Sequence, residues 1–265
     1  MKPLLGILQA AWKIIFLLNF VLSLILIFPF FYIFLSKEKY YPLAFKLKKL
    51  WGHYLVYSVG IRYELINKDV LPPPPFIICP NHSSYLDILL TYCVFPHYFV
   101  FMGKQELSKV PLFNIFFKNM NILVDRKSNT GSHKAFVRAG SDVDKGHCIA
   151  IFPEATISKL APALLAFKNG PFKLAIDKQV PIVPVTFLNN WNLMQDAPFF
   201  KAKCGPGKAT IVVHKAIETK GLTEKDLLSL RTNTFNTIKS SIDNFIGAKK
   251  ADSRTENNQV DTIVK

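Results

Sequence analysis

The sequence predicts an α/β fold, with a central and largely β-sheet core flanked by helices and an N-terminal hydrophobic helical segment that attaches the chain to a membrane. Short apolar runs alternate with stretches of helical periodicity after about residue 58, and this alternation is typical of α/β layers. No charged residue occurs between Ile14 and Leu35. The chain has 265 residues, which suits one such domain better than two.

The N-terminal apolar segment is long enough to reach across a bilayer. A helix over 14–35 covers about 33 Å at 1.5 Å per residue. Its length and the absence of a small-residue cleavage site argue against a removed signal peptide. Pro29 leaves a second interpretation open, in which the segment bends and returns to the same leaflet. Lysines flank both ends, with more of them from Lys37 onward, which favours the cytoplasm for the following residues.

The segment from Tyr40 to Tyr57 has apolar residues at near-helical spacing beside a basic face of Lys46, Lys48 and Lys49. This pattern fits an amphipathic helix, either on a bilayer or packed on the domain. We therefore divide the chain into membrane-attachment helices over 1–57, an α/β domain over 58–248, and a polar tail over 249–265 that is expected to be disordered.

Within the α/β domain, strands and helices follow in alternation. The expected strands are Ile61–Ile66, Phe76–Cys79, Tyr98–Phe101, Asn121–Val124, Cys148–Phe152, Val180–Phe187 and Thr210–His214. The expected helices are Leu86–Val94, Leu112–Lys118, Ser132–Asp144 and Gly170–Lys178, with a closing helix capped by Thr223.

The charge balance favours anionic partners. Net charge is +15, which suits lipid head groups, an acidic carrier protein or phosphorylated substrates. No nucleic-acid-binding module is recognisable, so nucleic acid is not an expected partner. The 4 cysteines have no paired or metal-ligand spacing, which indicates reduced thiols, and no metal is expected.

The most informative pair is His82 and Asp87, which lie between a predicted strand and a predicted helix. A carboxylate that orients an imidazole makes it a general base for a hydroxyl. Spacing alone is weak evidence, but two further polar motifs follow strands of their own. Arg126 ends one strand, and Pro153-Glu154-Ala155-Thr156 ends another. The carboxyl edge of an α/β sheet is where ligands bind. Taken alone, an Arg such as Arg126 after a strand is more often a solvated or ion-paired surface residue, and Glu154 is more often a cap or a salt-bridge partner.

Four stretches together resemble the glycerolipid acyltransferases, most closely the bacterial lysophosphatidic acid acyltransferases. They are Asn81-His82 with Asp87, then Lys104-Gln-Glu-Leu107 with Ile122-Leu-Val-Asp-Arg126, then Phe152-Pro-Glu-Ala-Thr156, then Val180-Pro-Ile-Val-Pro-Val185. The blocks occur in the family's order and cover roughly residues 40 to 245.

This resemblance implies a function and a site. It implies acyl transfer to the sn-2 hydroxyl of lysophosphatidic acid from acyl-carrier protein or coenzyme A, with the thioester as co-substrate and no separate cofactor. It implies a catalytic dyad of His82 and Asp87, with acceptor-binding residues at Lys104, Arg126, Glu154, Thr156 and Lys168. The location that it implies is the cytoplasmic face of a bacterial inner membrane.

Two departures from the family pattern concern the third block. Ala155 stands where the family usually has Gly, and Ile157 where it often has Arg. If that position needs a positive φ, the alanine is strained or the loop shifts. Loss of the Arg removes a phosphate donor, although Lys168 offers positive charge nearby in the sequence.

Three other functions stay open on the sequence. The acceptor could be another lysophospholipid or a lyso-aminolipid, for which Ile157 is the supporting feature. A membrane-anchored basic binding module without catalysis would need neither His82 nor Asp87. Thioester hydrolysis would use water in place of the lipid hydroxyl.

Overall fold

The computed structural model describes residues 2–67, 70–109, 112, 114–118, 120–125 and 127–263, and its centre is a seven-stranded mixed sheet. The strands are β1 (Ile61–Ile66), β2 (Ile77–Pro80), β3 (Phe99–Lys104), β4 (Ile122–Val124), β5 (Cys148–Ala150), β6 (Ile182–Phe187) and β7 (Gly207–Val213). The order across the sheet is β1-β7-β6-β2-β5-β3-β4. Neighbours from β6 to β4 pair in parallel, whereas β7 is antiparallel to β6 and carries β1 beside it.

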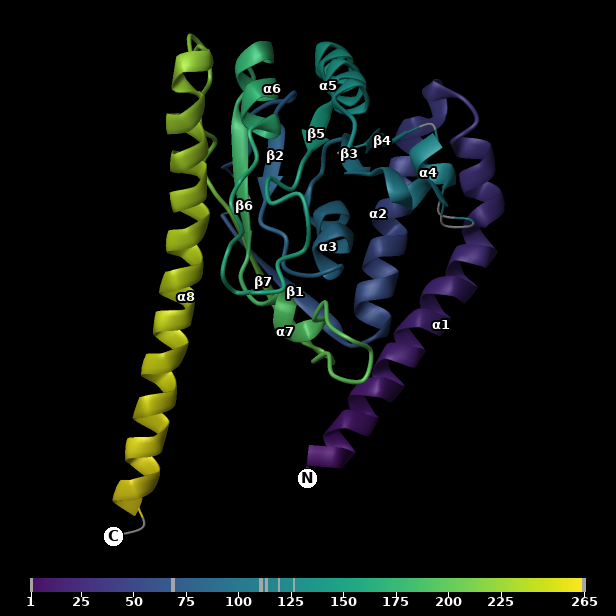
Figure 1. The fold of residues 1–265 in the computed structure, drawn as a ribbon. Helices are drawn as coiled ribbons and strands as arrows, with labels where there is room; N and C mark the ends of the chain where they lie inside the picture. Colours follow the sequence, from purple (N-terminus) through teal and green to yellow (C-terminus); the bar gives the residue numbers. More distant parts are fainter. Residues whose placement is uncertain are drawn as a thin grey trace.

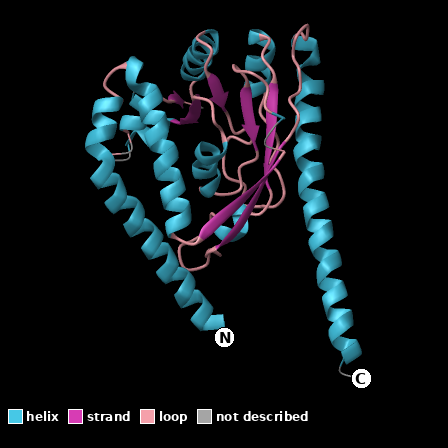
Figure 2. Ribbon diagram, turned by 180° about the vertical axis from the view of Figure 1, so that it is seen from behind, coloured by secondary structure: helices cyan, strands magenta, loops and turns pink. Residues whose placement is uncertain are grey.

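Helices cover both faces of the sheet (Figures 1 and 2). They are α1 (Lys2–Phe34), α2 (Tyr41–Ser58), α3 (Leu86–Val94), α4 (Ile115–Lys118), α5 (Asn129–Asp144), α6 (Gly170–Lys178), α7 (Asn190–Leu193) and α8 (Leu227–Ile263). The predicted α/β architecture is therefore confirmed. The bounds of α3 and α6 agree with those expected from the sequence, and most strands agree to within two or three residues.

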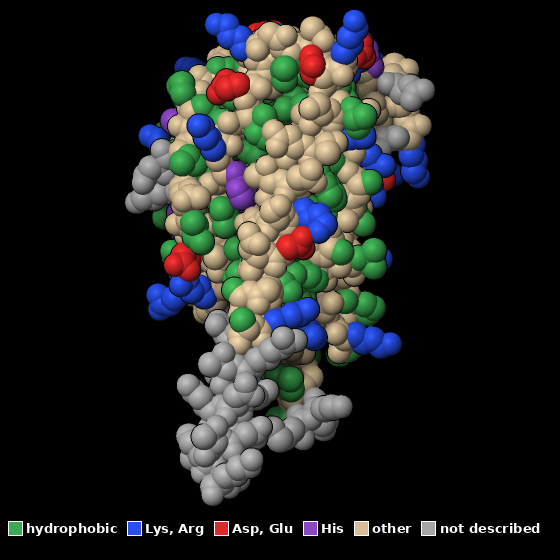
Figure 3. Space-filling view, turned by 90° about the vertical axis from the view of Figure 1, so that its left-hand side faces the viewer, with side chains coloured by type: hydrophobic (Ala, Val, Ile, Leu, Met, Phe, Trp, Pro, Cys, Tyr) green, Lys and Arg blue, Asp and Glu red, His purple; other side chains and the backbone are tan. Residues whose placement is uncertain are grey.

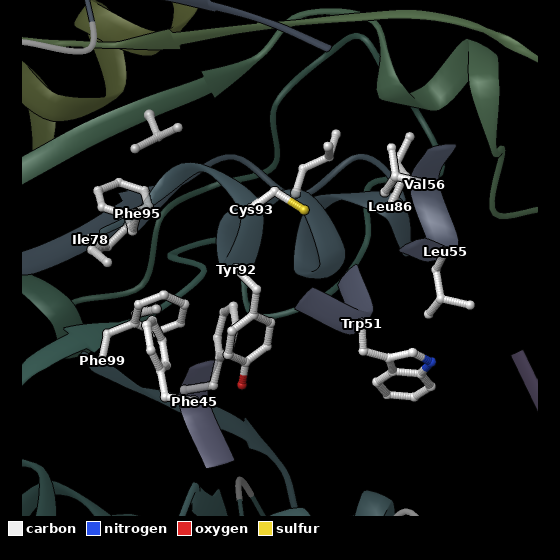
Figure 4. Close-up of a cluster of buried hydrophobic side chains, with 14 of the residues drawn as sticks. Phe45, Trp51, Leu55, Val56, Ile78, Leu86, Tyr92, Cys93, Phe95 and Phe99 are labelled. Atoms are coloured by element: carbon white, nitrogen blue, oxygen red, sulfur yellow. The ribbon is translucent and has the colours of Figure 1, made fainter. Parts of the chain in front are cut away.

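Successive side chains of β2 point to opposite faces of the sheet, so this strand contributes to two separate hydrophobic clusters. Ile78 points into a cluster with α2 and α3, while Ile77 and Cys79 point into another with α5, α6 and α8. A strand that is buried on both faces reads as a continuous apolar run. Figure 4 shows part of the first cluster, in which Trp51 and Tyr92 lie among aliphatic and aromatic side chains.

The N-terminal apolar segment forms a single helix that continues through Pro29. It lies along α2 and the domain: the ring of Trp51 stands 5.0 Å from that of Phe20 and 6.0 Å from that of Phe31. Polar side chains of α1 face this contact, since Ser23 accepts from Trp51 Nε1 and Asn19 accepts from the Tyr54 hydroxyl. The opposite face exposes apolar side chains from Leu4 to Ile33 along the helix.

Helix α2 packs on the domain rather than presenting a uniform basic face. Phe45, Trp51 and Leu55 are buried, and so is Lys48, which the sequence pattern places on the basic face. Lys46 is exposed. The helical period brings Lys48 onto the same side as Phe45 and Trp51, so its burial follows from its position three residues from each.

The C-terminal helix is longer than the sequence suggests. Thr223 caps its start through a capping box with Asp226, as expected, and α8 then runs to Ile263. Residues 249–263, for which we expected a disordered tail, continue the helix instead. Alanine and lysine at 248–251 are strong helix formers, and no glycine or proline follows Gly247 to end the helix.

Candidate active site

The loop after β2 carries the first candidate residues and is anchored to β6. Asn81 Nδ2 donates to the Phe187 carbonyl at 3.1 Å, and Asn81 Oδ1 accepts from Phe187 N–H at 2.7 Å. Through these two bonds the Asn81 side chain continues the pairing of β2 with β6 beyond the end of β2. They therefore fix the point at which the chain leaves the sheet. His82 then lies at the carboxyl edge, where the sequence places it.

His82 and Asp87 are in contact. His82 Nδ1 lies 3.0 Å from Asp87 Oδ2, and Asp87 is fully buried in the first turn of α3. The same oxygen accepts from the backbone N–H groups of Ser83 and Ser84 at 2.6 and 2.8 Å. A carboxylate at a helix N-terminus is favoured by the helix dipole. Because Nδ1 is held by Asp87, Nε2 is the ring nitrogen that is left for chemistry.

Asn190, at the start of α7, completes the environment of Asp87. Its Nδ2 donates to Asp87 Oδ1 at 2.7 Å, so both carboxylate oxygens are engaged. This residue could not be found from the sequence, because 103 positions separate it from Asp87 and only the strand order brings β2 beside β6. The visible signal is a pair of asparagines directly after an apolar strand. Its first member, Asn189, serves β7 instead, where it accepts from Thr210 N–H.

Phe152 covers one face of the imidazole. The rings of His82 and Phe152 are nearly parallel with their centroids 3.9 Å apart, and the ring of Phe101 stacks with that of Phe152 at 5.8 Å. A stack of this kind restricts rotation of the imidazole and keeps water from that face. Phe152 begins the stretch Phe152-Pro-Glu-Ala-Thr156, but the sequence does not show that its ring stacks on His82.

Glu154 holds the backbone of His82. Its Oε1 accepts from His82 N–H at 2.7 Å and its Oε2 accepts from Leu165 N–H at 2.7 Å. Burial raises the pKa of this carboxyl to about 7, and the two amide bonds oppose that shift. With both oxygens on backbone amides, the geometry favours a positioning role for a side chain that the family resemblance assigns to the acceptor.

The loop after β5 grips His82 from a second side. Ser158 N–H donates to the His82 carbonyl at 2.8 Å, so the amide groups on both sides of the His82 Cα are held by this loop. Ala155 takes a φ of +65° in its turn. The loop therefore keeps the left-handed conformation that a glycine would allow, and alanine accepts the strain.

The other predicted residues within the described ranges lie at or after the carboxyl ends of β3 and β5. Lys104 ends β3 and is exposed, with its Nζ 3.3 Å from Glu106. Thr156 and Lys168 are exposed, and the backbone N–H of Lys168 donates to the Pro153 carbonyl. Ile157 is buried, so it presents no group to solvent in place of the family's Arg. Arg126 lies outside the described residues.

Comparisons with known proteins show what the chain is similar to. A family model described as Acyltransferase matches residues 62–188, a range that includes His82, Asp87 and Glu154. A human 1-acyl-sn-glycerol-3-phosphate acyltransferase beta is 30% identical over 177 residues, covering 66% of this chain and 62% of its own length. A Chlamydomonas reinhardtii protein named as a 1-acyl-sn-glycerol-3-phosphate acyltransferase is 29% identical over 213 residues, covering 78% and 61%.

The fold also matches a solved structure. The crystal structure of a 1-acyl-sn-glycerophosphate acyltransferase from Thermotoga maritima superposes with a TM-score of 0.75, covering 92% of this chain and 98% of that one at 20% identity. The chain spans about three fifths of the length of the curated relatives from Caenorhabditis elegans and Chlamydomonas. On the motif order and these matches, the chain belongs to the acyltransferase family.

Proposed function

We propose that this protein transfers a fatty acyl group from a thioester of acyl-carrier protein or coenzyme A to the sn-2 hydroxyl of lysophosphatidic acid, giving phosphatidic acid. The observation that carries the proposal is the contact of His82 Nδ1 with a fully buried Asp87, both of whose oxygens are hydrogen-bonded. The names of the relatives supply the class of acceptor.

In the proposed reaction His82 acts as a general base without an acyl-enzyme. The acceptor hydroxyl gives its proton to Nε2 as its oxygen attacks the thioester carbonyl. The tetrahedral intermediate then collapses, an ester forms, and the thiolate leaves with the proton from Nε2. Asp87 stabilises the imidazolium between these steps, and base assistance of this kind contributes about 10²–10⁴-fold.

The acceptor phosphate is proposed to lie among the exposed basic groups at the same edge. Lys104 and Lys168 are exposed there, and Arg126 and Thr156 are included on the strength of the family resemblance. Exposed ammonium groups suit a lipid head group that arrives from the membrane. For Glu154 we propose no direct contact with the acceptor; it acts on the reaction by holding the backbone of His82.

For membrane attachment we propose that α1 lies in one leaflet instead of crossing the bilayer. Contacts with the domain run from Gln9, which accepts from Cys204 Sγ, to Phe31 against Phe116. These 23 residues, 9–31, rise about 33 Å along the helix, which is close to the thickness of the hydrocarbon core. A crossing helix would have to give up these contacts. The long apolar outer face supports association with lipid. Because relatives come from Mycoplasma as well as from eukaryotes, the proposed location is a membrane without a commitment to the bacterial inner membrane. The cytoplasmic face is proposed from the lysines that follow the apolar segment.

One observation favours a second candidate function, acylation of a different lysolipid. Ile157 is buried where the family often carries an Arg, so one phosphate donor is missing from the third block. A lysophospholipid with a larger head group, or a lyso-aminolipid, would depend less on that donor.

The test is thiol release by detergent-purified full chain with palmitoyl-coenzyme A and then palmitoyl-acyl-carrier protein, with and without lysophosphatidic acid. We expect release that depends on the acceptor, phosphatidic acid as product by mass spectrometry, and a loss of at least 10²-fold in His82→Ala. His133→Ala, on α5, is the control.

Other outcomes decide between the alternatives. Release with another lysolipid only would support the second candidate. Release without any acceptor would indicate hydrolysis, and no release by folded protein would remove the enzyme proposal.

A further inference from the structure

The loop between α7 and β7 presents two phenylalanines to solvent. Phe200 is 83% exposed, the highest value among the large hydrophobic residues of the described chain, and Phe199 is 42% exposed. Their rings meet edge to face at 5.2 Å. Leaving a phenylalanine side chain in water forgoes about 1.5–3 kcal/mol of burial free energy, so an exposed pair at a loop tip indicates a partner.

This loop, residues 195–204, is held in a defined shape. Gln195 and Lys203 are joined twice, by Gln195 N–H to the Lys203 carbonyl and by Lys203 N–H to the Gln195 side chain. Pro198 O accepts from the N–H groups of Lys201 and Ala202, which closes the turn. The phenylalanines therefore stand at the tip of a closed turn, and their exposure follows from the fold of the loop.

The loop is also hydrogen-bonded to α1. Lys13 of α1 donates to the carbonyls of Phe199 and Ala202, and its ammonium lies 5.1 Å from the centre of the Phe199 ring. Cys204 Sγ donates to the Gln9 carbonyl. Figure 1 shows the loop beside the first turns of α1 at the N-terminal end of the molecule. Leu4 and Leu8 in those turns are themselves exposed.

The side chains at the tip of this loop indicate which kind of partner it binds. Lys201 directly follows the phenylalanines, Lys203 comes two residues later, and both are exposed, so the loop carries aromatic rings and ammonium groups together. Aromatic side chains that sit at the boundary of the acyl chains, with lysines at the level of the phosphates, are the pattern of an interfacial membrane contact. The loop lies beside α1, whose outer face exposes apolar side chains from Leu4 to Ile33.

We propose that residues 195–204 form a second membrane-docking element that inserts Phe199 and Phe200 into the interface of a bilayer with anionic head groups. Together with α1 it gives the domain two separate points of attachment. Two attachments fix the rotation of the domain on the membrane, which one helix leaves free.

The element also connects lipid to the catalytic dyad. Met194 directly precedes the loop, and its carbonyl accepts from the Ser84 hydroxyl at 2.6 Å. Four residues earlier, Asn190 donates to Asp87. Docking of the loop therefore holds the edge of the sheet that carries His82 toward the surface in which a lysolipid acceptor resides, so this inference rests in part on the proposed function.

The test uses an environment-sensitive thiol probe on the full-length chain. All four native cysteines are buried, so Phe200→Cys offers one exposed thiol, and Leu228→Cys offers a matched one. Leu228 is 60% exposed on α8, on the opposite side of the molecule from α1 (Figure 1) and on a surface where charged and apolar side chains are interspersed (Figure 3).

With vesicles that contain anionic lipid, we expect the probe at 200 to shift to shorter emission wavelength and to be quenched at least twofold by brominated acyl chains. The probe at 228 should show neither change. Equal signals at both sites, or a probe at 200 that stays in water while the protein floats with the vesicles, would overturn the proposal. This readout does not depend on catalysis, so it stands apart from failure of the proposed function.

A second measurement separates docking from folding. Phe199→Ser with Phe200→Ser should keep the thermal midpoint of the unchanged protein but lower kcat/KM for vesicle-embedded acceptor by about 5-fold or more, with kcat/KM for a monomeric short-chain acceptor unchanged. Leu228→Ser should change neither value. An equal loss on both acceptors would assign the phenylalanines to the catalytic site and contradict a docking role.

Discussion

At the scale of single residues, Glu154 is the side chain whose role the structure redefines most. Its two oxygens bind the backbone amides of His82 and Leu165. Glu154→Gln retains one acceptor oxygen and turns an NH₂ group toward the other N–H, so one bond is lost and a repulsive contact is made. We expect kcat to fall by about 10–100-fold with KM for the lysolipid within about twofold.

The control for this change is Glu106→Gln, which removes an exposed carboxylate that pairs with Lys104 and should leave kcat unchanged. A Glu154→Gln enzyme with normal kcat and a greatly raised KM would instead place this carboxyl against the acceptor.

Ala155 gives a second prediction at this scale. Its φ of +65° costs about 1–2 kcal/mol for a residue with a Cβ, and glycine removes that cost at an entropic penalty of about 0.5–1 kcal/mol. Ala155→Gly should therefore stabilise the protein by about 0.5–1 kcal/mol in denaturant unfolding. Ala163→Gly, in the same loop and without a positive φ, should be neutral or destabilising. A loss of stability in Ala155→Gly would contradict the strain.

At the scale of elements, α2 contains a buried amine. Lys48 Nζ lies 3.1 Å from Met120 Sδ and 4.8 Å from the centre of the Phe116 ring, and burial lowers its pKa to about 7. Because the folded pKa is below the unfolded one, the folded state holds fewer protons, and stability rises with pH between about 7 and 10.5.

Lys48→Met should therefore stabilise the protein by roughly 2–4 kcal/mol at pH 7, by removing the cost of burying a charge. The gain should shrink as pH approaches 10. Lys46→Met, at an exposed position of the same helix, should have little effect. Urea unfolding at pH 7 and pH 9.5 measures both, and a gain that is independent of pH would remove the titration from the explanation.

Much of the element plan could be predicted from the sequence, because apolar runs and helical periodicity are local. The apolar run Val180–Phe187 predicts the strand that the structure has as β6, and Thr223 predicts the start of the last helix. The burial of Lys48 could not be predicted, because a lysine is assigned to solvent by default and only its neighbours on α3 and α4 show otherwise. Nor could Asn190, whose partner is brought to it by the order of strands across the sheet.

At the scale of the whole molecule, net charge and apolar surface attract the protein to a membrane over different distances. A net charge of +15 attracts anionic membranes, but salt screens it, with a Debye length of about 10 Å at 0.1 M and 3 Å at 1 M. The apolar contact of α1 is not screened.

We expect the rate of capture by anionic vesicles to fall about tenfold between 0.05 and 0.5 M NaCl, while protein that is already bound stays bound at 0.5 M in flotation assays. Vesicles of zwitterionic lipid should capture the chain slowly at both salt concentrations. Release of bound protein by salt would mean that the attachment is chiefly electrostatic and that α1 does not reach the acyl chains.

The long separation between Lys13 and its acceptor at Ala202 has a consequence for how the chain is made. The two residues are 189 positions apart, and at about 5–20 residues per second the ribosome needs roughly 10–40 s to cover that distance. During this time α1 is complete, yet the surface on which it will rest does not exist. A bilayer is then the apolar environment within its reach. Synthesis at the membrane would thus let the nascent helix wait in lipid until the domain folds against it.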